Sequence, residues 1–221
     1  MANFLERSKI HVTFHQAKKI RRHNRKLKME GVERCHVVSG YPKSGNTWLA
    51  RMVSDLIGCE LVAYLTDIRE QLPRESHLAP DKLLRDVVVV KSHHTASLLK
   101  LGGVDLSDSV FVVRDPRDIA VSGSGFIFSS DNVPSEENID RMIDLMVEAK
   151  KPGVRWQDLR WDCFLQSAIE KKVLMVRYED LVTDPVGSLR RILTHLRYER
   201  SDDQIERVVS FHNFATAKAS G

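Results

Sequence analysis

The chain alternates short apolar runs with longer stretches in which apolar residues recur at helical spacing. Each apolar run is bounded by polar or turn-forming residues, which is typical of a buried strand. These runs predict strands over residues 35–39, 60–64, 87–90, 110–113 and 173–177. The helical spacing predicts helices over residues 47–57, 116–122, 136–151, 155–171, 185–196 and 202–212, and the polar residues 66–84 are expected to form a loop.

The order of these elements predicts the fold class. Val87-Val88-Val89-Val90 is a β-branched run that suits a strand covered on both faces, as in a parallel sheet. Because strands alternate with helices, we expect an α/β fold with a central parallel sheet and helices on both faces, like that of the P-loop NTPases. A length of 221 residues allows one such core. The expected division is a basic helical extension over residues 1–34 and an α/β domain over residues 35–221.

Positive charge is concentrated at the start of the chain. The net charge is +4, yet residues 1–30 carry nine basic residues against two acidic ones. Such a run can bind nucleic acid or an anionic membrane. We favour the solvated face of a helix with no nucleic-acid partner, its opposite face carrying the apolar residues Phe14, Ala17, Ile20 and Leu27. An organelle transit peptide stays open as an alternative.

The cysteines bear on the compartment. Cys35, Cys59 and Cys163 lack the spacing of metal ligands or of a disulfide framework. They fit a reducing compartment and are expected to be small buried residues. No apolar run reaches the length of a membrane span, and no signal peptide opens the chain. The sequence therefore predicts a cytoplasmic protein.

The segment between the first expected strand and the first expected helix is rich in glycine and polar residues. Gly40 and Gly45 have the spacing of the P-loop pattern G-x-x-x-x-G-K-[ST], and Thr47 takes its hydroxyl position. Asn46 stands where the pattern has lysine, while Lys43 lies inside the loop. A strand, a glycine turn and a helix together aim backbone N–H groups at a phosphate. We therefore interpret the segment as a phosphate-binding loop rather than as an ordinary strand-to-helix turn.

This segment also carries a resemblance to a known family. Tyr41-Pro42-Lys43-Ser44-Gly45-Asn46-Thr47-Trp48 resembles the 5'-phosphosulfate loop of the sulfotransferases that use 3'-phosphoadenosine-5'-phosphosulfate (PAPS). The resemblance implies PAPS as the cofactor, without a metal. It also implies roles for the loop residues: Trp48 would stack on the adenine, and the phosphosulfate would be held by Lys43, Ser44, Gly45, Asn46 and Thr47.

A second motif follows the expected strand over residues 87–90. Lys91 and His93 share one face of an extended segment, and His94 points to the other face. Val90-Lys91-Ser92-His93 resembles the lysine-threonine-histidine segment of the same family, with serine in place of threonine. The resemblance implies that His93 removes the proton of the acceptor and that Lys91 steadies charge near the bridging oxygen. Histidine is a suitable base near neutral pH, and His94 is expected to be its surface neighbour.

A third motif follows the strand over residues 110–113. The segment 112–122 resembles the family's 3'-phosphate site, where Arg114 and Ser122 would grip the phosphate. An arginine fork and a hydroxyl suit a phosphate dianion. The alternative is a surface network in which Arg114 and Arg117 pair with Asp115 and Asp118, and we expect Arg117 to be structural.

The last motifs concern the adenine. By the same resemblance, Tyr178 contacts the ring, and Phe211 faces the P-loop tryptophan across it. The family usually continues into an arginine-lysine-glycine loop that closes on the 3'-phosphate. Residues 217–221 do not have that pattern. Three alternatives stay open: the C-terminal part of the family domain is missing, Lys218 or another basic residue substitutes for the loop, or the nucleotide is bound weakly.

The carboxyl ends of parallel strands meet at one edge of a sheet, so the loops 40–48, 91–94, 114–122 and 177–180 are expected to form one site. The predicted function is transfer of the sulfuryl group of PAPS to a hydroxyl or amine of a small molecule, with His93 as the base and Lys43 and Lys91 assisting. Five aromatic or apolar residues are candidates for the acceptor wall, although Trp161 is expected to be core: Phe126, Ile127, Phe128, Trp156 and Trp161.

Two other functions fit part of this pattern. A small-metabolite kinase would use Asp115 and Thr47 to hold Mg²⁺, but Asn46 replaces the lysine that such kinases place on the transferred phosphate. A catalytically silent nucleotide-binding module is the second alternative. The sequence leaves the acceptor and the oligomeric state open.

Overall fold

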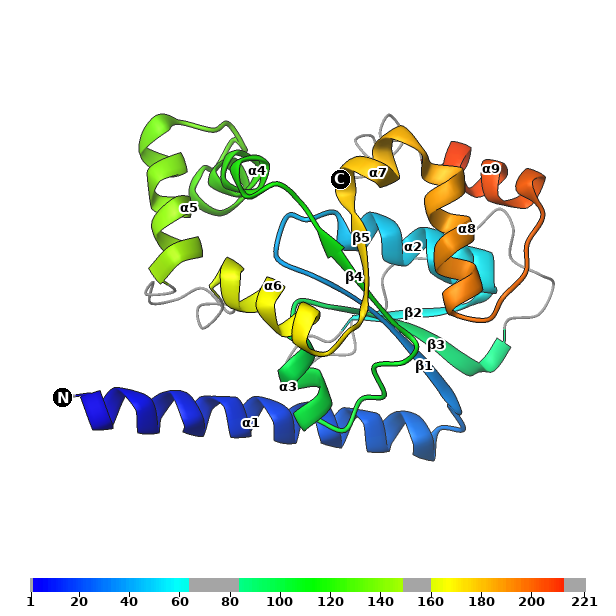
Figure 1. Ribbon diagram of the computed structural model, residues 1–221, viewed down its shortest axis with the longest axis horizontal. Helices are drawn as coiled ribbons and strands as arrows, with labels where there is room; N and C mark the ends of the chain where they lie inside the picture. Colours follow the sequence, from blue (N-terminus) through cyan, green and yellow to red (C-terminus); the bar gives the residue numbers. More distant parts are fainter. Residues whose placement is uncertain (1, 64–83, 149–159, 213–221) are drawn as a thin grey trace.

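The computed structural model describes residues 2–63, 84–148 and 160–212, with the backbone alone for residues 2–13 (Figure 1). Five strands in this part of the chain form one parallel sheet in the order β2-β3-β1-β4-β5. All five predicted strands are present: β1 (Arg34–Gly40), β2 (Cys59–Ala63), β3 (Leu84–Ser92), β4 (Ser109–Val113) and β5 (Leu174–Arg177). The predicted parallel α/β fold is confirmed.

Helices cover both faces of this sheet, as Figure 1 shows. One layer contains α1 (Ala2–Met29), α3 (Ala96–Leu101), α4 (Pro116–Phe128), α5 (Glu136–Glu148) and α6 (Trp161–Glu170). The other contains α2 (Asn46–Ile57), α7 (Tyr178–Thr183), α8 (Pro185–His195) and α9 (Asp202–Phe211). Residues 66–83 of the expected loop and the segment 149–159, including Trp156, lie outside the described residues, whereas Leu84, the last residue of that loop, begins β3.

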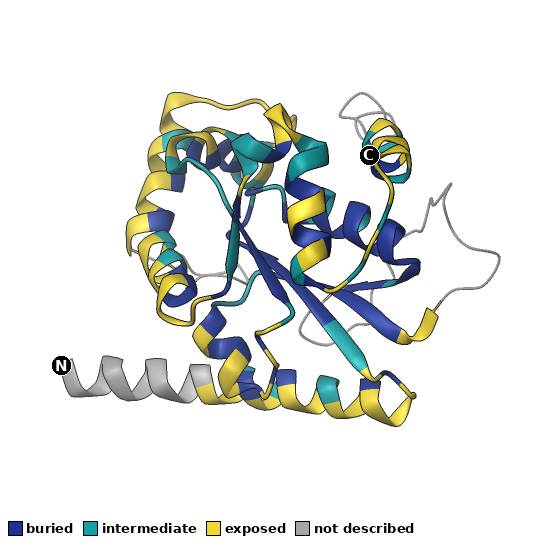
Figure 2. Ribbon diagram, turned by 45° about the vertical axis from the view of Figure 1, so that its right-hand side comes forward, coloured by how far each residue is buried: buried dark blue, intermediate teal, exposed yellow. Residues whose placement is uncertain are grey.

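The β-branched run in β3 explains how the sheet is covered. Val88 and Val90 pack into the first layer, whereas Val87 and Val89 pack into the second. All four side chains are at most 4% exposed, and the strands are the most buried part of the molecule (Figure 2). Side chains that alternate between two buried faces require an apolar residue at every position.

Helix α4 continues to Phe128, so the predicted end at residue 122 is wrong. The glycines that follow Ser122 suggest a helix end, but here they allow close packing. A Cβ atom on Gly123 would lie 2.6 Å from Met142 of α5, and one on Gly125 would lie 2.5 Å from the carbonyl oxygen of Asn132. The glycines therefore serve the contacts of the helix rather than its termination.

The basic segment forms the predicted helix, and three of the four residues expected on its apolar face are buried: Ala17, Ile20 and Leu27. The expectation for Phe14 is wrong, because this side chain is 61% exposed. The helix contacts the end of α3 around Ile20, where a Cβ atom on Gly102 would approach to 2.4 Å. Phe14 lies nearer the start of the helix, about 9 Å from Ile20 along the helix axis at ~1.5 Å per residue. Among the described residues, none of the helices is long and apolar enough to cross a membrane.

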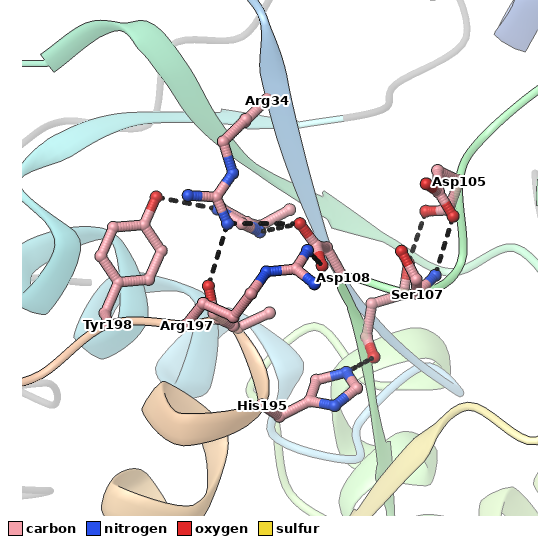
Figure 3. A network of polar contacts seen from close by, with 10 residues as sticks. Arg34, Asp105, Ser107, Asp108, His195, Arg197 and Tyr198 are labelled. Carbon is pink, nitrogen blue, oxygen red and sulfur yellow. Dashed lines mark hydrogen bonds and ion pairs between the residues drawn. The ribbon is translucent and has the colours of Figure 1, made fainter.

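A polar network joins the sheet to the segment after α8, at the amino ends of β1 and β4 (Figure 3). Asp108 forms ion pairs with Arg34, at 3.3 Å, and with Arg197. The buried ring of His36 lies 3.1 Å from the Tyr198 hydroxyl. Burial, together with the charge of Arg34, lowers the pKa of His36 to about 4. This network holds the sheet at the edge opposite the predicted site.

Candidate functional site

The loop between β1 and α2 has the geometry of a phosphate-binding loop. The Ser44 backbone N–H donates to the carbonyl oxygen of Tyr41 at 3.0 Å, which closes a tight turn. Lys43 and Gly45 have φ angles of 69° and 90°, in the left-handed region. A Cβ atom on Gly45 would lie 2.6 Å from the ring of Tyr178, so this position requires glycine for both its backbone angle and its close contact.

Two polar atoms of the site are buried and have no hydrogen-bond partner among the described residues. They are Ser44 Oγ, in the loop, and Arg114 Nε, after β4. Buried polar groups are rarely left without a partner. A buried hydroxyl and a buried guanidinium N–H that lack a hydrogen-bond partner can donate to the oxygens of a bound phosphate. Their position beside the start of a helix also favours an anion. The residues present therefore fit a phosphorylated nucleotide.

Asn46 ties the loop to the end of β3. Its Nδ2 donates to the carbonyl oxygen of Ser92 at 2.7 Å and lies 3.4 Å from Nδ1 of His93. The side chain is thus committed to the protein and almost fully buried, at 3% exposure. Any role of Asn46 in binding an anion would come from its backbone N–H.

His93 is oriented by the first glycine of the loop. Its Nδ1 lies 2.8 Å from the carbonyl oxygen of Gly40, which can only accept a hydrogen bond. This contact assigns the proton to Nδ1 and leaves Nε2 as the basic nitrogen. Burial lowers the pKa of His93 to about 4, with the charge of Lys91 adding to the shift. His93 is therefore neutral, and able to accept a proton, at neutral pH.

His94 differs from its prediction as a surface residue. It is only partly exposed, and burial lowers the pKa of its ring to about 4. Its backbone bridges two strands: the N–H donates to Ser92 Oγ at 3.0 Å, and the carbonyl accepts from Ser39 Oγ at 2.8 Å. His94 therefore has a structural role at the end of β3.

The two arginines after β4 have different environments. Arg117 pairs with Asp115 at 2.5 Å on the surface, as expected for a structural residue. Arg114 instead donates from Nη1 to the carbonyl oxygen of Lys43 at 3.0 Å and lies 4.2 Å from the centre of the Tyr178 ring. The Arg117–Asp115 pair of the alternative surface network is thus present, while Arg114 also joins the phosphate-binding loop.

Ser122 lies on α4, one turn beyond Asp118 and on the same face of the helix. Asp118 Oδ2 in turn lies 3.8 Å from Nε of Arg114. This pair belongs to the alternative network, in which Arg114 and Arg117 pair with Asp115 and Asp118. The alternative is therefore present at both arginines, although Arg114 also contacts the phosphate-binding loop.

Aromatic residues lie next to the phosphate-binding loop, at the start of α2 and of α7. The rings of Trp48 and Tyr178 are 6.2 Å apart in an edge-to-face arrangement. The Trp48 indole N–H donates to the carbonyl oxygen of His212 at 2.7 Å, and Phe211 stands next to His212 at the end of α9. Three of the predicted adenine contacts therefore come from elements that meet here, while the pairing of Trp48 with Phe211 across a ring stays a prediction.

An exposed aromatic residue on α4 contacts the loop lysine. The Nζ of Lys43 lies 3.9 Å from the centre of the Phe126 ring, and Phe126 is 59% exposed. Burial and the charge of Arg114 lower the pKa of Lys43. Trp161 packs against the core, as expected. No group of three or more potential metal ligands occurs among the described residues.

Comparisons with known proteins agree with this arrangement. The sulfotransferase domain family matches residues 34–220. Mouse sulfotransferase 1E1 is 22% identical over 195 residues, which cover 82% of this chain and 65% of that protein. The chain thus spans less than two thirds of the length of the first curated relatives that it matches.

Solved structures share the fold. Mouse sulfotransferase SULT7A1, complexed with PAP, aligns with a TM-score of 0.62 and 22% identity over 86% of this chain and 68% of that one. Retinol dehydratase, in complex with androsterone and the inactive cofactor PAP, aligns with a TM-score of 0.57 and 20% identity over 84% of this chain and 66% of that one. With the family match spanning residues 34–220, the chain belongs to the sulfotransferase domain family.

Proposed function

We propose that the protein transfers the sulfuryl group of PAPS to a hydroxyl or amine of a small-molecule acceptor. The observation that carries this proposal is the contact of His93 Nδ1 with the Gly40 carbonyl oxygen at 2.8 Å, which places a neutral histidine at the start of the phosphate-binding loop. Membership of the sulfotransferase domain family supports the reaction.

The donor would be held at three points. Ser44, Thr47 and Lys43, with the N–H groups of the loop, would hold the phosphosulfate. Arg114 and Ser122 would hold the 3'-phosphate. The adenine would lie against the aromatic residues Trp48, Tyr178 and Phe211. The Ser44 hydroxyl and the Arg114 Nε–H support the first two assignments, because both are buried and neither has a hydrogen-bond partner among the described residues.

The bound donor supplies an activated sulfuryl group and a phosphate leaving group. The protein supplies a base: Nε2 of His93 would take the proton of the acceptor as its oxygen or nitrogen attacks sulfur. Lys43 and Lys91 would stabilise the negative charge that develops between the sulfuryl group and the leaving phosphate. Since the proton on Nδ1 is held by Gly40, the ring stays oriented when it becomes charged.

The acceptor we infer has an apolar or aromatic body that carries its hydroxyl or amine. Phe126 supports this inference, because its exposed ring lies beside the lysine that would contact the phosphosulfate. Retinol dehydratase, which shares the fold, has been crystallised with androsterone and with retinol. The cytoplasmic location expected from the sequence stays a prediction.

Calorimetric titration with adenosine 3',5'-bisphosphate tests the donor site. We expect binding that does not depend on Mg²⁺, and no comparable binding of ATP. Binding of ATP only in the presence of Mg²⁺, without binding of the bisphosphate, would overturn the proposal in favour of the kinase. Bisphosphate binding without transfer from PAPS to a panel of phenols, alcohols and amines would favour the silent binding module.

A further inference from the structure

We propose that Asp55 and His212 form a positioning pair that fixes the adenine-binding wall. The inference rests on the proposed function, because it takes Trp48 to be an adenine contact. It adds two residues that do not themselves touch the nucleotide.

The pair joins the end of α9 to the last turn of α2. The Nε2 atom of His212 lies 2.6 Å from Oδ2 of Asp55, and the two side chains are only 11% and 5% exposed. A carboxylate so deeply buried requires a partner, since an uncompensated buried charge is costly. Among the described residues, the hydrogen-bond partner of the Asp55 carboxylate is His212.

The same histidine also holds the tryptophan. Trp48 precedes Asp55 by seven residues, or two helical turns, so both side chains lie on one face of α2. Trp48 donates its indole N–H to the backbone carbonyl of His212 at 2.7 Å, while Asp55 holds the ring of that residue. Helix α2 thus contacts His212 twice, with Trp48 at its backbone carbonyl and with Asp55 at its side chain.

This double contact fixes two parts of the predicted wall. It sets the orientation of the Trp48 indole, and it places the end of α9, with Phe211, next to α2. The rings are then ordered before the nucleotide binds, so binding costs less conformational entropy. The contribution should be felt at the adenine and not at the phosphates, because the pair holds Trp48 and the end of α9 rather than the loop before α2 or Arg114.

Binding of two ligands separates these roles. One is adenosine 3',5'-bisphosphate, and the other is base-free 1,2-dideoxyribose 3,5-bisphosphate. For Asp55→Ala and for His212→Ala, which keeps the backbone carbonyl, we expect the affinity for the adenosine ligand to fall about tenfold. The affinity for the base-free ligand should stay unchanged. The double variant should be no weaker than either single variant, because the two residues act as one unit.

The controls keep the test decisive. Asp55→Asn retains a hydrogen-bond acceptor and should lose less affinity than Asp55→Ala. Glu206→Gln alters an exposed carboxylate on α9, the helix that His212 follows, and should bind both ligands as the wild type does. Equal losses for both ligands, or additive losses in the double variant, would overturn the positioning role. If the wild type fails to bind the adenosine ligand at all, the proposed function itself falls.

Discussion

The Nδ1 atom of His93 lies 2.8 Å from the carbonyl oxygen of Gly40, so the predicted base and the predicted phosphate-binding loop share a hydrogen bond. The two residues are 53 positions apart in the sequence and meet because β1 and β3 are neighbours in the sheet. A base fixed to the loop is also fixed relative to whatever the loop binds. This relationship leads to the first prediction.

Replacing His93 should abolish proton transfer without disturbing the donor site. In His93→Ala we expect turnover to fall by about 10²- to 10⁴-fold, as is typical for the loss of a general base. Affinity for adenosine 3',5'-bisphosphate should stay close to that of the wild type. Sulfuryl transfer from radiolabelled PAPS and calorimetric titration measure the two quantities. Wild-type turnover in this variant would remove His93 from the mechanism.

The pH dependence of the rate should report the same residue. Because burial holds the pKa of His93 at about 4, the ring stays neutral from neutral pH down to roughly pH 5. Below its pKa the ring is protonated and cannot act as a base, so kcat/KM should fall about tenfold per pH unit there. Initial rates, started from enzyme kept at neutral pH, measure this profile. An acid limb centred near pH 6.5 would contradict it.

Gly45 should be intolerant of a side chain. Gly45→Ala combines a φ of 90° with a Cβ atom 2.6 Å from the Tyr178 ring, and we expect it to destabilise the protein by about 1–3 kcal/mol. Gly103→Ala is the matched control, since Gly103 has a φ of 81° and nothing within 4 Å of the added atom. Urea unfolding measures the free energy of unfolding of both variants, and Gly103→Ala should lose less of it than Gly45→Ala. Equal losses of unfolding free energy would show that the contact with Tyr178 contributes nothing.

The sequence predicted the parts of the site better than their connections. The β-branched run of β3 and the glycine spacing of the loop are local signals, and both elements are present. The contacts of Asn46 with Ser92, and of Arg114 with Lys43, depend on which strands are neighbours. Strand order is a property of the whole packed sheet, so no local pattern contains it.

The errors have the same origin. Gly123 and Gly125 resemble a helix end in the sequence, but the space they leave is filled by residues of α5 and of the segment after α4. Phe14 continues the apolar face of α1, but the end of the short helix α3 packs against Ile20, nearer the C-terminal end of α1, and leaves Phe14 exposed. In both cases a tertiary neighbour decided the outcome.

Acid should destabilise the fold through its buried histidines. Burial lowers the pKa of His36, His93 and His94 to about 4, against about 6.5 in an unfolded chain. Between these two pH values the unfolded chain binds more protons, so the free energy of unfolding falls as the pH falls. Each histidine contributes up to about 1.4 kcal/mol per pH unit in this window.

Substitution at His36 tests this without touching the site. In His36→Gln we expect the unfolding free energy to fall less steeply between pH 6.5 and 4. The slope should decrease by about the contribution of one histidine that takes up one proton on unfolding. Urea unfolding across this pH range measures the slope. The exposed residue His15 offers a control, since His15→Gln should leave the slope unchanged. A slope that is the same in all three proteins would show that other groups cause the acid sensitivity.

Phe126 should act on the acceptor rather than on the donor. Its ring lies 3.9 Å from the Nζ of Lys43 and is 59% exposed, so it forms a surface beside the predicted phosphosulfate contact. In Phe126→Ala we expect KM for an aromatic acceptor to rise about tenfold, because an aromatic contact of about 1–1.5 kcal/mol is lost. KM for PAPS should change little, and Phe126→Tyr should retain most of the affinity for the acceptor. Steady-state kinetics with each substrate varied in turn separates the two constants. A rise confined to KM for PAPS would instead assign Phe126 to the positioning of Lys43.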